Sequence, residues 1–396
     1  MARAIYAFSW YDIGAVPTLI ESGLHIGVAQ FGIILGSFLI GAAVFQLPAG
    51  LAAMRWGSRR VSLVALAVMG AFALASGFAP NWYVLAALRF GVGAGAALFF
   101  SPALGMVAGY FPAGSRGPVI GLYNAGFSAG AAAGLLLGAV IGTTLGWPWA
   151  LGLGGVALLL AAGATSVFLP DVLARPPRRT LSELLVSARP VLRSRALWFL
   201  ALGLTGLWAL YYIVAQFFVA YAGDVHPGWP LAVAVSLPTV MILVEIVGGP
   251  AGGLFGERTR DMRRPLLLAG VPSAAAVLLI PVLPIDALFV VFIFLGIAAG
   301  VSFAVLYLIP SYLPEVRGEG FSLALALING IQILAGSALA IAFGFLAADL
   351  GYTVAWIFAA GVGLAPLVLL FGVPGNRPSG TGDSSVRPAQ GSSVDS

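Results

Sequence analysis

Three charged side chains interrupt long apolar stretches of the sequence: Asp12, Arg89 and Glu245. A charge inside an apolar helix is costly unless it faces protein or water, so such residues often mark a binding site or a proton pathway. Arginine binds anionic groups, whereas a buried carboxylate can hold a proton or stay ionised beside an arginine. These three residues are therefore the first candidates for chemistry.

We predict that Arg89 binds an anionic group or tunes the acidity of Asp12, which would act as a proton site. The alternative is a static ion pair that fixes helix packing. Glu245 has two candidate roles. It is either a coupling carboxylate, whose protonation is linked to the binding of another ligand, or a protonated residue that only stabilises the fold.

Residues for enzyme chemistry are scarce. The chain has two histidines, His25 and His226, and no cysteine. No group of histidines and carboxylates has the spacing of metal ligands, so we predict no metal site, no cofactor and no enzymatic activity.

The composition indicates which elements must position the three charges. The chain has 396 residues, of which 60% are hydrophobic and 8% are charged, and its mean hydropathy is +1.03. A soluble protein could not cover that much apolar surface. The apolar runs show no alternation, so we predict helices that span a lipid bilayer rather than the strands of a barrel.

We predict an all-α membrane protein with twelve transmembrane helices. Their expected ranges are 4–22, 26–53, 60–79, 82–110, 117–144, 148–170, 196–222, 228–255, 265–283, 286–311, 318–347 and 352–373.

The arginines indicate the orientation of these helices. The chain has no lysine, and 18 of its 19 basic residues fall at the two ends, in the middle loop or in alternate connections. The opposite connections carry no arginine, and their titratable residues are acidic residues and histidines. The positive-inside rule therefore places both termini and the middle loop in the cytoplasm. The net charge of +5 follows from this topology, so we predict no nucleic-acid partner.

The middle loop divides the chain into an N-terminal bundle, 1–170, and a C-terminal bundle, 196–374. Within the linker, 171–195, Thr180 and Glu183 have the spacing of a capping box, and the following leucines recur at helical intervals. We predict a short amphipathic helix on the inner leaflet. It either controls the movement of the bundles or only tethers them. We expect the Gly- and Ser-rich tail, 375–396, to be disordered.

Three landmarks recur at one spacing. The basic hairpin from Gly50 to Arg60 returns from Gly253 to Arg264, Arg116 returns as Arg317, and Leu145-Gly146 returns as Leu350-Gly351. An internal duplication in so apolar a chain indicates a transporter built from two halves.

The first hairpin resembles a signature of the major facilitator superfamily of secondary transporters. The matching residues are Gly50, Arg55, Gly57, Arg59 and Arg60. In that superfamily an acidic residue occupies the place of Met54 and helps to hold one conformational state. The second hairpin offers Gly253, Glu257 and Arg258, so we predict that the C-terminal copy carries more of this conformational latch. Arg89, Gly93 and Gly95 also resemble a superfamily motif whose arginine faces the central cavity.

The resemblance implies two six-helix bundles around a cavity lined by the first, fourth, seventh and tenth helices. Asp12 and Arg89 would then lie in one bundle, where an interaction between them is feasible. Further polar candidates are Tyr11, Asn124, Tyr211, Tyr212, Gln216, Tyr307 and Asn329. We favour the cavity for Tyr211, Tyr212 and Gln216. For Asn124 and Asn329 we favour hydrogen bonding between helices.

We therefore predict a monomeric secondary transporter of the inner or plasma membrane. It would move a small anionic or polar metabolite by alternating access, coupled to protons. The first alternative is an efflux antiporter for drugs or metabolites, although the fifth helix lacks the Gly-Pro pair of that group. A second alternative, of a different class, is a membrane sensor that keeps the fold without transport.

Overall fold

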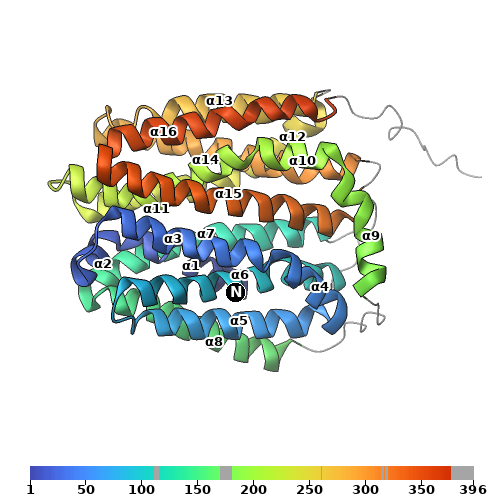
Figure 1. The fold of residues 1–396 in the computed structure, drawn as a ribbon, viewed down its shortest axis with the longest axis horizontal. Helices are drawn as coiled ribbons and strands as arrows, with labels where there is room; N and C mark the ends of the chain where they lie inside the picture. Colours follow the sequence, from blue (N-terminus) through green and yellow to red (C-terminus); the bar gives the residue numbers. More distant parts are fainter. Residues whose placement is uncertain (111–115, 170–180, 260, 314–315, 317–319, 376–396) are drawn as a thin grey trace, which may run out of the picture.

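The computed structural model describes residues 1–110, 116–169, 181–259, 261–313, 316 and 320–375. In this part of the chain the regular structure is helical, and most helices lie side by side along the long axis of the molecule (Figure 1). Outside it fall residues 171–180 of the expected linker, Arg317 and nearly all of the expected tail.

The first half of the chain forms the helices α1 (Ala2–Tyr11), η1 (Ile13–Ala15), α2 (Pro17–Leu24), α3 (Val28–Val44), α4 (Gln46–Trp56), α5 (Ser58–Ser76), α6 (Trp82–Tyr110), α7 (Arg116–Leu145) and α8 (Trp147–Phe168). The linker helix is α9 (Leu181–Arg193). The second half forms α10 (Arg195–Gly203), α11 (Thr205–Val225), α12 (Leu231–Arg258), α13 (Arg263–Val277), α14 (Ile285–Leu308), η3 (Ile309–Tyr312), α15 (Gly320–Leu350), α16 (Tyr352–Leu364) and η4 (Ala365–Gly372).

Ten helical stretches of the described chain are long and apolar enough to cross a membrane. The other two expected spans, 4–22 and 265–283, fall on shorter helices: α1, η1 and α2 in the first case, and α13 in the second. Two further spans expected as single helices are each divided into two α-helices, α3 and α4 in one case and α10 and α11 in the other, and the spans 286–311 and 352–373 end in the 3-10 helices η3 and η4. Pro48 explains the first division, because it has no N–H to bond to the carbonyl of Val44.

The break between α1 and α2 is local in origin. Pro17 begins α2 and disfavours helical backbone at the residue before it; Val16 has φ −132° and ψ 34°. The chain therefore passes through the short helix η1, and Asp12 becomes the C-cap of α1. A carboxylate expected inside a continuous helix thus lies at the junction of α1 and η1.

Helices of the two halves pack against each other at defined places. α3 packs on α15, α7 packs on α12, and α11 contacts both α2 and η1. The backbones of α3 and α15 approach so closely that a Cβ added at Gly32 would lie 3.2 Å from the Cα of Gly344. Nearby, the Ser337 hydroxyl donates to the carbonyl of Gly36 at 3.0 Å.

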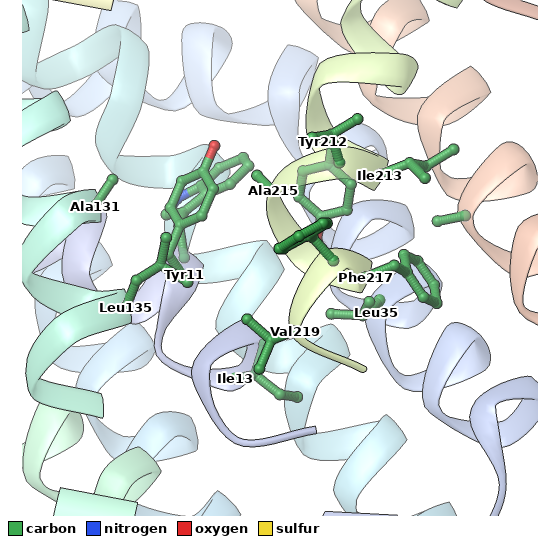
Figure 2. Packing of buried hydrophobic residues seen from close by; sticks show 14 of the residues in the cluster. Tyr11, Ile13, Leu35, Ala131, Leu135, Tyr212, Ile213, Ala215, Phe217 and Val219 are labelled. Carbon is green, nitrogen blue, oxygen red and sulfur yellow. The ribbon is translucent and has the colours of Figure 1, made fainter. Parts of the chain in front are cut away.

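α11 is buried along almost its whole length and forms the centre of the apolar core. Figure 2 shows Ile213 and Phe217 of α11 near Leu35 of α3, with Tyr11 of α1 and Leu135 of α7 across from them. Because this cluster joins residues from both halves of the chain, the halves share one continuous apolar core at this level.

The duplication appears in the backbone as well. Gly146 and Gly351 both have positive φ, 95° and 86°, and each is the N-cap of the helix that follows, α8 and α16. Positive φ favours glycine, which explains why the same residue recurs at these two equivalent turns.

Candidate functional site

A cavity of about 540 Å³ lies between helices of the first and second halves of the chain. We call it the central cavity. Small-molecule sites typically enclose about 300–1,000 Å³, so a metabolite of modest size would fit. Six of the residues selected from the sequence line it: Tyr11, Asn124, Tyr211, Tyr212, Glu245 and Asn329.

Three other selected residues are not among those that line the central cavity: Asp12, Arg89 and Gln216. Tyr307 belongs to α14, but its side chain lies outside the described residues.

Asp12 and Arg89 form a buried ion pair. Nη2 of Arg89 lies 2.9 Å from Oδ1 of Asp12, and the side chains are 1% and 0% exposed. Nη1 of Arg89 also donates to the carbonyl of Ser9 at 3.3 Å, a group near the broken end of α1. The positive charge of Arg89 is thus already matched by a carboxylate within the first half of the chain.

Glu245 has a different environment. It comes from α12, lines the central cavity and accepts a hydrogen bond of 2.7 Å from the hydroxyl of Tyr211 on α11. The Tyr211 ring meets Phe303 edge to face. The carboxylate therefore has one fixed donor and lines the cavity. In this position it can exchange a proton with a molecule inside the cavity.

Gln216 joins the two halves. Its Nε2 donates to the backbone carbonyl of Trp10 at 2.9 Å, and its Oε1 is close enough to Gly14 that an added Cβ there would overlap it. Gln216 is fully buried. It therefore fastens α11 to the broken end of α1, instead of facing the cavity as the sequence suggested.

Sequence reasoning missed Arg3, which lines the central cavity and is 8% exposed. It was counted among the arginines that indicate orientation, because it falls so near the start of the first apolar stretch. One signal was available: Tyr6 and Trp10 follow at intervals of three and seven residues and share its helix face. The same cavity is lined by Gln46, at the start of α4.

The first basic hairpin is anchored by one arginine. Arg59 donates from Nε and Nη2 to the carbonyl of Leu169, at 3.1 and 2.8 Å, and from Nη2 to that of Ser166 at 2.9 Å. It thereby caps the end of α8. Gly57 has φ 87°. By contrast, Arg55 and Arg60 are exposed.

The second hairpin is anchored to the segment that follows η4. The N–H of Met262 donates to the carbonyl of Gly375 at 3.1 Å, and Arg263 pairs with Asp261 at 2.8 Å. The Glu257 side chain lies outside the described residues, and Arg258 is exposed. Gly50 and Gly253 occupy open positions in their hairpins. The described acid–base pair of this hairpin is Asp261–Arg263, and the expectation for Glu257 and Arg258 stays a prediction.

The described residues form ten membrane-length apolar helices and a metabolite-sized cavity between the two halves, which is the arrangement of a multi-pass membrane protein of the transporter class. Residues 1–336 match the Major Facilitator Superfamily. The match covers most of the chain, which therefore belongs to this superfamily. Its members are transporters, not enzymes, and the described residues contain no group of three potential metal ligands.

Two curated relatives share parts of the sequence. A hexuronate transporter of Bacillus subtilis is 33% identical over 107 residues, which are 27% of this chain and 25% of the relative. A 4-hydroxybenzoate transporter of Pseudomonas putida is 31% identical over 159 residues, 40% and 36% of the two chains. The chain thus aligns with only about a quarter to a third of the length of these relatives.

Among solved structures, a bacterial homologue of the human lysosomal transporter Spinster, in an inward-facing and unoccupied conformation, superposes with a TM-score of 0.70. The superposition covers 93% of both chains at 19% sequence identity. At that identity the likeness establishes the fold alone.

Proposed function

We propose that the protein is a secondary transporter that carries a small anionic metabolite through the central cavity by alternating access. The observation that carries the proposal is the cavity itself, about 540 Å³ between two sets of helices. The two curated relatives are described as transporters of hexuronate and of 4-hydroxybenzoate, both of which are carboxylates. This supports an anionic substrate.

The moving parts are two six-helix bundles, 1–170 and 196–374, joined by the linker 171–195. We infer twelve crossings in all, with α1, η1 and α2 forming the first and α13 with its following turns forming the ninth. Both termini lie in the cytoplasm, and the protein acts as a monomer in the inner or plasma membrane. The arginine distribution supports this orientation.

We infer an inward-facing state. Near α2 the halves are in contact through Gly32 and Gly344 and through α11, which contacts both α2 and η1. The cavity lining runs from Tyr11 toward Arg3, at the start of α1. In Figure 1, α2 lies at one end and α9 crosses the other. The contacts near α2 and a cavity lining that extends to the start of α1 support this conformation.

Glu245 is the coupling carboxylate in this proposal. It lines the cavity and has a hydroxyl donor, whereas Asp12 is sealed in its pair with Arg89. Besides Tyr211, the titratable side chain of Tyr11 interacts electrostatically with Glu245 and also lines the cavity. We therefore assign the proton to Glu245 and a packing role to Asp12–Arg89.

The test is uptake of 4-hydroxybenzoate into proteoliposomes under an imposed pH gradient. Accumulation driven by inward proton flow supports the symport. Glu245→Gln should abolish this accumulation. The control is Asp349→Asn, which replaces an exposed carboxylate at the end of α15 and should leave the accumulation intact. Equal flux without a gradient would remove proton coupling. Proton-driven export would favour the efflux antiporter, and binding without any flux would favour the sensor.

A further inference from the structure

We propose that Arg3 binds the carboxylate of the substrate and that the aromatic rings around it make the central cavity selective for flat aromatic carboxylates. The inference rests on the proposed transport of an anion and names its binding group and substrate class. It replaces Arg89, the anion site expected from the sequence, with a residue on the cavity wall.

Arg3 is surrounded by aromatic rings. Its guanidinium carbon lies 4.8 Å from the ring centre of Tyr6, 5.0 Å from Phe100, 4.8 Å from Tyr123 and 4.5 Å from Phe127. These rings come from α1, α6 and α7. Cations favour such positions within about 6 Å of a ring centre. The rings hold the guanidinium in place without supplying a negative charge.

No described carboxylate matches the charge of Arg3. Its Nε and Nη1 atoms are buried without a hydrogen bond from or to any described residue, and no described carboxylate forms an ion pair with it. An arginine stays protonated in proteins, so this positive charge persists at every physiological pH. A buried cation with unused donors is a built site for an anion, which a carboxylate would fill with two parallel hydrogen bonds.

Arg89 cannot serve in the same way, because its charge is matched. It pairs with Asp12 at 2.9 Å and is not among the residues that line the cavity. Among the described residues that do line it, Arg3 is the one cation. An anion that enters the central cavity therefore meets a single unmatched positive charge.

The walls beside Arg3 are suited to a flat ring. Tyr6, Trp10 and Phe127 pack together with ring centres 5.9 to 6.4 Å apart. On the other half of the chain, Trp208 and Tyr212 are stacked 5.5 Å apart at 7°. All five line the cavity. Aromatic pairs prefer offset or edge-on contacts over this range of distances, so a planar ligand ring would find partners on both walls.

The test is binding of three probes to the purified full chain in lipid nanodiscs, measured by calorimetry. The probes are 4-hydroxybenzoate, 4-hydroxybenzyl alcohol, which lacks the carboxylate, and cyclohexanecarboxylate, which lacks the aromatic ring. We expect 4-hydroxybenzoate to bind best. The loss of ring contacts should weaken cyclohexanecarboxylate by about 2- to 10-fold, and the alcohol should bind weakest.

Arg3→Met removes the charge while its flexible thioether fills the space among the rings. This variant should bind 4-hydroxybenzoate about 30-fold more weakly or worse, as expected when one partner of a desolvated charge pair is lost. Arg3→Lys should keep part of the affinity. The matched control is Arg189→Met on the exposed side of α9, which should bind as the wild type does.

Thermal unfolding separates binding from folding. Arg3→Met should melt no lower than the wild type, because an unpaired buried charge has been removed. Added 4-hydroxybenzoate should raise the melting temperature of the wild type but not that of Arg3→Met. Undiminished binding by a folded Arg3→Met, or a wild type that binds cyclohexanecarboxylate equally well, would overturn the inference and leave anion transport standing. A wild type that neither binds nor carries any of the carboxylates would overturn the proposed function as well.

Discussion

Breaking the Asp12–Arg89 pair should destabilise the protein far more than removing both charges. The two side chains are almost fully buried and 2.9 Å apart. Removing one partner of such a pair leaves an uncompensated buried charge, which costs about 3–5 kcal/mol, whereas replacing both partners is often close to neutral. We therefore expect Asp12→Asn and Arg89→Gln each to cost about 3–5 kcal/mol.

The double variant Asp12→Asn/Arg89→Gln should recover much of that loss, with a coupling energy of at least about 2 kcal/mol between the two sites. Equilibrium unfolding of the four proteins in detergent micelles gives the cycle. Additive single effects, with a coupling below about 0.5 kcal/mol, would refute the argument that both side chains are charged and mutually dependent.

Transport by the same four proteins decides between the two interpretations of the pair. If the pair only fixes packing, the double variant should regain proton-driven uptake along with its stability. If Asp12 carries the transported proton, the double variant should fold well and still fail to accumulate substrate against a gradient. Stability and transport therefore need to be measured on identical preparations.

Three further predictions concern the closed end and the hairpins. Gly14→Ala should lower stability by about 1–3 kcal/mol in a thermal unfolding assay, because the new methyl group would overlap Gln216. Gly361→Ala, where the added carbon meets open space, should have little effect, and equal results for the two would contradict the contact. Arg59→Gln should cost about 1–2 kcal/mol through lost hydrogen bonds to the end of α8, while Arg60→Gln, which is exposed, is the neutral control. The Arg263 side chain and N–H hold the pKa of the Asp261 carboxyl below its usual range. Asp261→Asn should therefore lower the stability by less than about 1 kcal/mol at neutral pH. The difference between this variant and the wild type should vanish once the pH falls below that pKa, because the wild-type carboxyl is then protonated.

Much of the architecture was readable from the sequence because each signal was repeated. Long apolar runs predicted the membrane helices, and the glycines at 146 and 351 mark equivalent turns of positive φ in both halves. The resemblance to the superfamily was confirmed by the match over residues 1–336. What the runs could not show is where a helix breaks, because Pro17 and Pro48 act through single backbone groups that composition does not register.

The candidate site was harder to predict for a related reason. The type of charge and its depth along an apolar stretch identified Asp12, Arg89 and Glu245. These two properties do not tell which charge is paired with an opposite charge in the fold. The pairing of Asp12 with Arg89 depends on how α6 packs against the broken end of α1. Arg3 was passed over because its depth, judged along one helix, looked peripheral. Its burial comes from Phe100 and Phe127, whose helices lie far along the chain.

The charges of the central cavity suggest why anion and proton would be carried together. Arg3 and Glu245 line the cavity from different halves of the chain, and neither pairs with an oppositely charged described residue. A carboxylate at Arg3 and a proton on Glu245 would together leave no unmatched charge in a low-dielectric cavity, whereas either one alone leaves a charge uncompensated. An ionised Glu245 also repels an entering anion.

The affinity for the anion should therefore depend on pH. The wild type should bind 4-hydroxybenzoate more tightly in acidic than in alkaline buffer, since protonation of Glu245 removes the repulsion, while the charge of Arg3 does not change. Glu245→Gln mimics the protonated carboxyl and should bind tightly at both pH values, whereas Asp349→Asn should retain the dependence. If Glu245→Gln keeps the same pH dependence as the wild type, the linked proton resides on another group, and the neutralisation argument fails.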